Sequence, residues 1–120
     1  MNVPEFNAMP RRTVPDPFAT QVGARIRELR LERGMSLAEL ADASELSKGH
    51  LSSVEHGLAA ITIQTISRLA KGLNVPPLYI LTFVAEDERA HAAELVRKLP
   101  ADQVRKLRRQ LQVQLGLRKR

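Results

Sequence analysis

The stretch SLAELADASELSKGHLSSVEHG, residues 36–57, decides the fold. Ser36 and Glu39 stand three residues apart as a capping box, which predicts the start of a short helix. After a three-residue turn, Ser47 can cap a second short helix that ends at Gly57. Two short capped helices joined by a tight turn are typical of a helix-turn-helix motif.

Apolar residues recur at helical spacing on both sides of this stretch, which predicts further helices. Asp16 before Pro17 is a helix start, and Gly34 supplies the left-handed position that ends this first helix. Thr62 caps a later helix, which ends near Asn74. The stripe that we expect to face the core from this later helix comprises Ile63, Ile66, Leu69 and Ala70.

A fifth helix is predicted to begin at Pro76 and Pro77, because proline suits the first turn of a helix. The side chains expected to cover the core from it are Leu78, Tyr79 and Leu81. The sequence therefore predicts an all-α domain of five helices over residues 18–83. The preceding residues 1–17 hold four prolines and little hydrophobic periodicity, which indicates a flexible arm.

Residues 84–120 have the pattern of a helical tail that Pro100 interrupts. The apolar stripes of this tail need a covering surface. They comprise Ala92, Leu95, Val96 and Leu99 before the proline, and Val104, Leu107, Leu111 and Leu115 after it. The stripes could pack on the chain's own domain, pair with a second copy or receive another protein.

The net charge of +6 is concentrated in the tail. Residues 1–83 carry a net charge of +1 and residues 84–96 a net charge of −3, whereas residues 97–120 carry +8. The basic side chains of the last helix are Arg105, Lys106, Arg108 and Arg109. They could be an ordinary solvated face, or could contact phosphates or an acidic partner protein.

Composition excludes several classes of protein. The chain has no cysteine and three scattered histidines, so neither a disulfide framework nor a zinc site is expected, and we expect no cofactor. It has no glycine-rich phosphate loop, no paired carboxylates in a catalytic motif and no nucleophile partnered by a histidine. We therefore do not expect an enzyme. Aromatic residues make up 3%, too few for the stacking platforms that bind single-stranded nucleic acid.

No membrane association is expected either. The longest apolar run, residues 75–85, is interrupted by prolines and is shorter than the roughly 20 residues that a membrane span needs. The first residues do not have the pattern of a signal peptide. These features predict a cytoplasmic protein, and a DNA-binding function would associate it with the nucleoid.

Residues 22–83 resemble the lambda Cro and repressor type of helix-turn-helix regulator, the Xre family. The matching runs are RIRELRLERGMSLAELADASELSKGHLSSVEHG, residues 25–57, and TIQTISRLAKGLNVPPLYIL, residues 62–81. Family features recur at Arg30, Gly34, Ser36, Glu39 to Ala41, Ser47, Lys48, Leu51, Ser52, Glu55, Gly57 and Leu69 to Lys71. The resemblance implies a lambda-repressor-like fold and a transcriptional regulator that binds double-stranded DNA. It further implies a homodimeric repressor acting at a palindromic operator.

By this resemblance, the helix that follows Ser47 is the recognition helix, whose first residues face base edges in the major groove. Lys48, His50 and Ser53 are the candidate base readers, because their side chains can donate to or accept from base edges. Gly49 would let the backbone approach DNA closely. Hydroxyls and helix N-termini would hold phosphates. The expected DNA-binding residues are Ser36, Ser47, Lys48, Gly49, His50, Ser52, Ser53, Thr62 and Thr65.

Other positions have a structural interpretation. Arg30 and Glu55 match positions that pair internally in this family, so we expect an ion pair there. Two positions depart from the family pattern. The loop LAAI, residues 58–61, lacks the basic residue that often contacts a phosphate, and Glu45 takes a turn position often held by glycine.

The chain therefore divides into an arm (1–17), a helix-turn-helix domain (18–83) and a basic helical tail (84–120). Arg11 and Arg12 of the arm could enter a minor groove or remain solvated. Helix-turn-helix proteins usually read two half-sites related by a two-fold axis, so we expect the tail to dimerise. The residues expected in that interface are Val96, Leu99, Val104, Leu107, Leu111 and Leu115. The competing hypothesis is a protein-interaction module, such as an antitoxin or anti-regulator, that binds its partner through the tail.

Overall fold

A computed structural model describes residues 13–118, which contain helices and no β-strand. The elements are α1 (Pro17–Glu32), α2 (Leu37–Ala43), α3 (Lys48–Glu55), α4 (Ile63–Leu73), the 3-10 helix η1 (Pro77–Leu81), α5 (Glu88–Arg97) and α6 (Ala101–Gln114). The predicted all-α class is confirmed. Arg11 and Arg12, the two arginines of the predicted arm, lie outside the described residues.

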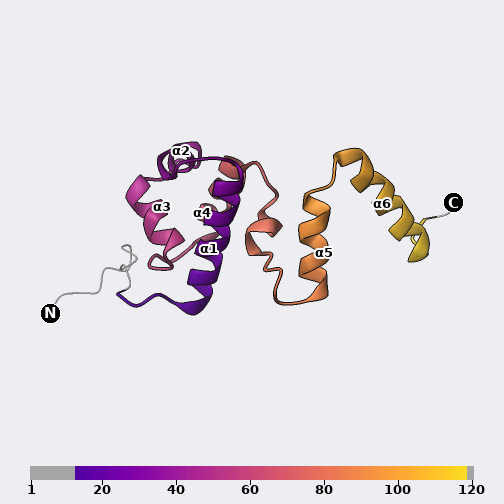
Figure 1. Ribbon diagram of the computed structural model, residues 1–120, viewed down its shortest axis with the longest axis horizontal. Helices are drawn as coiled ribbons and strands as arrows, with labels where there is room; N and C mark the ends of the chain where they lie inside the picture. Colours follow the sequence, from indigo (N-terminus) through magenta and orange to yellow (C-terminus); the bar gives the residue numbers. More distant parts are fainter. Residues whose placement is uncertain (1–12, 119–120) are drawn as a thin grey trace. The chain divides into compact units, whose positions relative to one another are not determined.

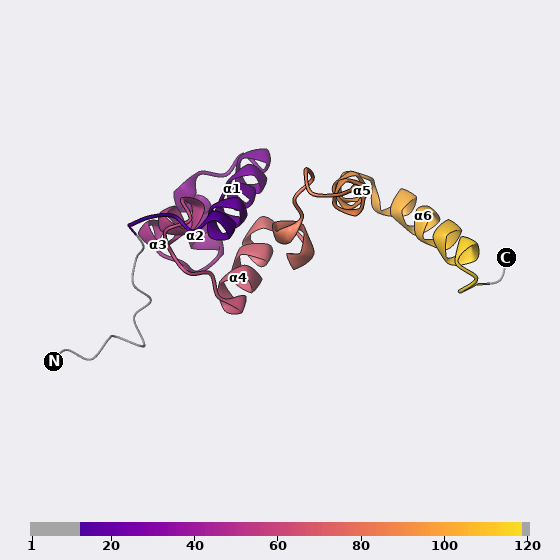
Figure 2. The same cartoon turned by 90° about the horizontal axis from the view of Figure 1, so that it is seen from below.

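The chain forms two compact units, one ending at Leu81 and the other beginning at Thr82. In the first unit α1, α2, α3 and α4 surround one apolar core (Figures 1 and 2). Helix α1 packs on α3, α2 packs on α3 and α4, and η1 closes against α1 and α4. The buried core side chains include Val22, Ile26, Leu29, Leu40, Leu51, Val54, Leu69, Leu73 and Ile80. Burying each large aliphatic side chain contributes roughly 1.5–3 kcal/mol, so this core determines where α3 is held.

The helix starts of the first unit are confirmed as predicted. A carboxylate oxygen of Asp16 accepts from the backbone N–H of Ala19 at 2.9 Å, and Pro17 is the first helical residue of α1. Ser47 caps α3 and Thr62 caps α4 in the same way. These caps satisfy N–H groups that a helix leaves without an internal partner, which is why local sequence places the helix starts so well.

Three predicted core positions are wrong. Ile63 is 86% exposed, because it is the first residue of α4 and projects beyond the packed part of the helix. Leu78 and Leu81 are also exposed, and Ile80 is the residue of η1 that fills the core. The segment is a 3-10 helix with about three residues per turn, so it turns a different side chain inward than an α-helix would.

The second unit holds α5 and α6, and both predicted tail helices are confirmed. Asp87 caps α5 by accepting from the N–H of Ala90 at 2.8 Å. The buried residue of α5 is Glu94, which accepts from Nε of Arg97 at 2.6 Å, whereas Leu95 of the predicted stripe is 56% exposed. The buried residue of α5 is therefore not a member of the predicted apolar stripe.

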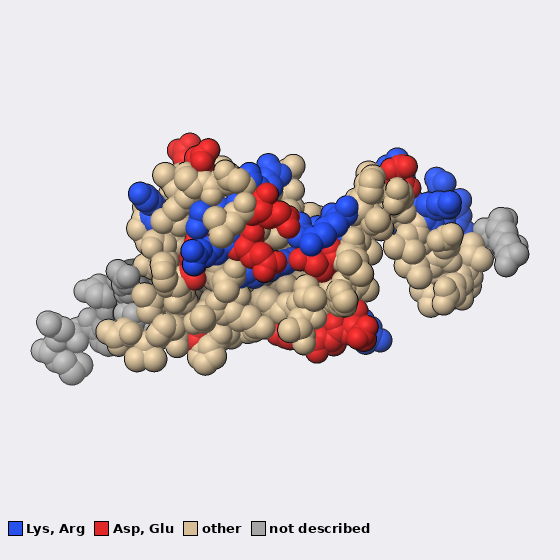
Figure 3. Space-filling model, in the orientation of Figure 1, with Lys and Arg blue, Asp and Glu red and all other residues tan. Residues whose placement is uncertain are grey.

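Helix α6 contains no buried residue. Its apolar stripe is half-buried at Val104 and Leu107 and exposed at Leu111, and Leu115 just beyond the helix is exposed as well. Figure 3 shows basic side chains gathered on one side of this segment, beside an uncharged surface. Among residues 13–118, no helix combines the length and apolar character needed to cross a bilayer.

Candidate nucleic-acid interface

A buried ion pair fastens the end of α3 to α1. Nε and Nη2 of Arg30 donate to the two carboxylate oxygens of Glu55 at 2.7 and 2.9 Å, and Nη1 donates to the carbonyl of Met35 at 3.0 Å. Arg30 and Glu55 are 8% and 9% exposed. Hydrogen bonding to Glu55 raises the pKa of the Arg30 guanidinium, so Arg30 stays charged. All three guanidinium nitrogens and both carboxylate oxygens are thus engaged within the protein.

The first turn of α3 faces solvent. Lys48, Gly49 and His50 are exposed, and Ser52 in the next turn is half-buried. A Cβ atom added to Gly49 would have no other atom within 4 Å, so the backbone is open to close approach here. The beginning of α3 therefore presents one cation, one imidazole and a bare stretch of backbone to a partner.

Ser53, the third predicted base reader, is buried in the free protein. Ser53 is 8% exposed, because α3 packs against both α1 and α2 and keeps only a narrow outer stripe. After the first turn, that stripe continues through Ser52 to His56. Lys48, Ser52 and His56 are spaced four residues apart, so they lie on one face of the helix.

The hydroxyls assigned to phosphates fall into two groups. Ser36, Ser47 and Thr62 are exposed at the starts of α2, α3 and α4. Thr65 is only 7% exposed and its hydroxyl lies 3.0 Å from that of Thr62, so it is less accessible to a phosphate than the other three. Three exposed helix starts remain where N–H groups and hydroxyls can meet an anion.

The capping box at the start of α2 limits what Ser36 can offer. Its hydroxyl accepts from the N–H of Glu39 at 3.0 Å, and the Glu39 carboxylate accepts from the N–H of Ser36 at 2.9 Å. Hydrogen bonding to the Ser36 N–H, and after it to the Ser36 hydroxyl, lowers the pKa of Glu39, so its negative charge persists beside the helix start. The N–H groups of Leu37 and Ala38 are therefore the donors that the capping box leaves for a phosphate.

The turn between α2 and α3 contains a residue with a backbone conformation that is unfavourable for a side chain. Glu45 has φ 57°, a left-handed conformation that favours glycine, and Gly34 and Gly57 have φ 67° and 73°. The α2–α3 turn is thus built with a side chain where the family pattern often has none.

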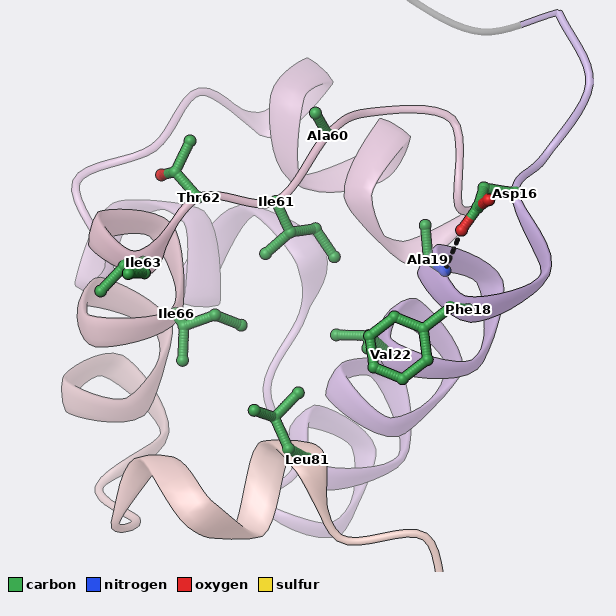
Figure 4. A pocket seen from close by; sticks show the side chains of 10 residues that line it. All are labelled: Asp16, Phe18, Ala19, Val22, Ala60, Ile61, Thr62, Ile63, Ile66 and Leu81. Carbon is green, nitrogen blue, oxygen red and sulfur yellow. Dashed lines mark hydrogen bonds between the residues drawn. The ribbon is translucent and has the colours of Figure 1, made fainter.

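The uncharged loop after α3 belongs to an apolar groove of about 520 Å³ (Figure 4). Ile61 from the loop points toward this groove, as do Phe18, Val22 and Leu81 from α1 and η1, and Ala60 lines its edge. Asp16 is the charged residue at its edge. The loop residues therefore line a hydrophobic surface, and they supply no cation at the end of α3.

Sequence patterns missed a small cleft of about 190 Å³ beside the end of α3. It is lined by Arg27, Arg30, Leu37, Ser52, Glu55 and His56. Nδ1 of His56 lies 2.7 Å from the Ser52 carbonyl, which can only accept, so Nδ1 carries the proton. The four-residue spacing of Lys48, Ser52 and His56 could have indicated that His56 lies on the exposed face of α3. No sequence pattern near Arg27 indicates that it lies beside α3. Among residues 13–118, no cluster of three or more potential metal ligands occurs.

Comparisons with known proteins agree with this geometry. A helix-turn-helix family model matches residues 26–80. The HTH-type transcriptional regulator RamB of Mycobacterium tuberculosis is 36% identical over 76 residues, covering 63% of this chain but only 15% of RamB. The transcriptional regulator ClgR of the same organism is 30% identical over 80 residues, covering 67% of this chain and 70% of ClgR. This chain thus spans far less than two thirds of RamB.

A solved structure shares the fold of the first unit. The restriction-modification controller protein C.AhdI from Aeromonas hydrophila matches with a TM-score of 0.51 and 32% sequence identity. The match covers 52% of this chain and 94% of C.AhdI.

Proposed function

The chain belongs to the Cro/C1-type helix-turn-helix family of transcriptional regulators, and from this premise we propose that it is a homodimeric repressor that reads duplex DNA through α3. Its target is a palindromic operator, one half-site for each copy. As a regulator of chromosomal genes it acts in the cytoplasm, at the nucleoid. The single observation that carries this proposal is the exposed first turn of α3, held in place by the Arg30–Glu55 pair.

The exposed residues of α3 have the chemistry for the major groove. Lys48 can donate to the O6 and N7 acceptors of guanine, and His50 can donate or accept according to its tautomer. Ser52 takes the place of Ser53, since Ser53 is buried. Gly49 lets the helix lie close to the base edges. These contacts specify sequence, whereas contacts to phosphates from Ser36, Ser47 and Thr62 position the helix.

Dimerisation through the tail is supported by its uncovered apolar stripes. Leu111 and Leu115 are 45% and 68% exposed, Leu99 is 37% exposed, and Val96, Val104 and Leu107 are half-buried. Pairing two such stripes across a two-fold axis would bury them and set two α3 helices on one operator. Repression needs only occupancy of that operator, whereas activation also needs a contact with the transcription machinery.

The recognition helix is tested with the variant Lys48→Ala/His50→Ala. We expect this variant to keep its fold. Its affinity for an operator obtained by selection from a random duplex library should fall at least about tenfold, since one good base contact contributes about 1–3 kcal/mol. The matched control is Lys71→Ala, an exposed lysine on α4. Equal affinity of the double variant and the control would contradict the assignment of α3.

The dimer is tested with the full-length variant Leu107→Asp/Leu111→Asp. Sedimentation equilibrium should show a dimer for the wild type and a monomer for the variant, because charges on a stripe that the dimer would bury oppose association. A variant that remains dimeric would place the interface elsewhere.

The competing function, a protein-interaction module acting through the tail, is favoured by the uncharged loop at residues 58–61 and by the basic, uncovered helix α6. It predicts that cellular activity survives Lys48→Ala/His50→Ala. Activity that falls together with operator binding would contradict it.

A further inference from the structure

The cleft at the end of α3 contains a cation, Arg27, that takes no part in the proposed contacts of α3 with DNA. Arg27 lies one helical turn before Arg30 on α1, so both guanidinium groups reach the same side of the helix. The Arg30 guanidinium already donates hydrogen bonds to Glu55 and to the carbonyl of Met35. Arg27 is exposed, and it forms no ion pair within residues 13–118. The net charge of the cleft therefore comes from Arg27.

The remaining groups of the cleft cannot replace this charge. The Glu55 carboxylate is neutralised by Arg30, and Leu37 is apolar. His56 directs Nδ1 to the Ser52 carbonyl at 2.7 Å, so this ring nitrogen is not available to an anion. A guanidinium in this position offers several N–H donors in a plane that matches two phosphate oxygens.

The position of the cleft identifies its ligand. Ser52 and His56 line the cleft and also continue the exposed stripe that begins at Lys48. If that stripe lies in a major groove, its end approaches the sugar-phosphate backbone at the groove's edge. The loop at residues 58–61, which follows α3 there, carries no charge. Arg27 is thus the cation placed where the loop lacks one.

We propose that Arg27 binds a phosphate of the DNA backbone in the cleft between α1 and the end of α3. This inference rests on the proposed function, because it requires α3 to lie in the major groove. The contact comes from outside the helix-turn-helix motif itself. It carries no sequence information and fixes how far the end of α3 tilts toward the backbone.

The test compares full-length wild type, Arg27→Gln and the matched control Arg68→Gln. Arg68 is also exposed, but it lines a different cleft, between the end of α2 and α4. Affinity for the selected operator and for a scrambled duplex is measured by fluorescence anisotropy over a range of salt concentrations. Thermal unfolding of each variant checks that the fold is retained, as expected for exposed arginines.

Loss of one phosphate contact has a specific signature. Arg27→Gln should lower the slope of log affinity against log salt by about 0.9. It should weaken the operator and the scrambled duplex alike, by about tenfold at low salt, because a phosphate contact is blind to sequence. Arg68→Gln should remain within about twofold of wild type, with an unchanged slope.

The outcomes separate this proposal from the function on which it rests. If wild type binds the operator and Arg27→Gln keeps the same slope, the phosphate site is wrong while the DNA-binding function stands. If Arg68→Gln loses as much as Arg27→Gln, overall charge explains the effect and the site is also wrong. If wild type binds no duplex at all, both proposals fail.

Discussion

Replacing Glu55 by alanine should destabilise the protein by about 3–5 kcal/mol, which is the usual cost of removing one partner from a buried ion pair. Arg30 is 8% exposed and donates two of its three hydrogen bonds to Glu55, at 2.7 and 2.9 Å. The variant leaves both donors and a full positive charge without a partner. Since domains of this size are stable by roughly 5–15 kcal/mol, much of the protein should unfold at moderate temperature.

The assay is urea unfolding followed by far-ultraviolet circular dichroism, with Asp42→Ala as the control. Asp42 is exposed on α2, so its loss should change stability by no more than about 0.5 kcal/mol. The double variant Arg30→Met/Glu55→Leu should be more stable than Glu55→Ala, because it leaves no unpaired buried charge. If Glu55→Ala lowers the free energy of unfolding by less than about 1 kcal/mol, or if the double variant is less stable than the single one, the unpaired charge of Arg30 is not the source of the destabilisation.

Three further substitutions test the backbone arguments, each measured by urea unfolding. Gly49→Ala should raise stability by about 0.5–1 kcal/mol while weakening operator binding, and unchanged binding would show that α3 does not approach DNA closely at this residue. Glu45→Gly should raise stability by up to about 1 kcal/mol by relieving the left-handed conformation at φ 57°, whereas a loss would mean that the Glu45 side chain is stabilising. Gly23→Ala should cost about 1–3 kcal/mol, since the new Cβ would lie 2.7 Å from the Glu55 carbonyl oxygen; a tolerated variant would mean that α1 and α3 can separate easily.

The sequence predicted best those features that a few neighbouring residues decide. The starts of the first four helices follow from side chains that bond N–H groups two or three positions away, as at Asp16 and Ser36. The left-handed conformation at Gly34 follows from the ability of glycine to adopt positive φ at the end of a helix. Such local chemistry does not depend on how the helices later pack.

The errors concern burial, which depends on neighbouring helices. Ser53 and Thr65 lie on correctly predicted helices, but α3 is enclosed on two sides and α4 turns its threonine inward. Likewise, the 3-10 geometry of η1 places Ile80 in the core, instead of the predicted Leu78 and Leu81. No local pattern marks Arg27 as a candidate contact, because its proximity to His56 arises only when α1 packs on α3.

The most direct test of the central claim is selection of binding sites by the full-length protein from a random duplex library at near-physiological salt. If α3 reads DNA as a dimer, one palindrome should be enriched, with half-site centres about 10 base pairs apart so that two α3 helices enter successive major grooves on one face. The Lys48→Ala/His50→Ala variant should lose that enrichment while staying folded. Failure of the folded wild type to enrich any sequence, or the same palindrome recovered by the variant, would contradict the claim that α3 reads DNA.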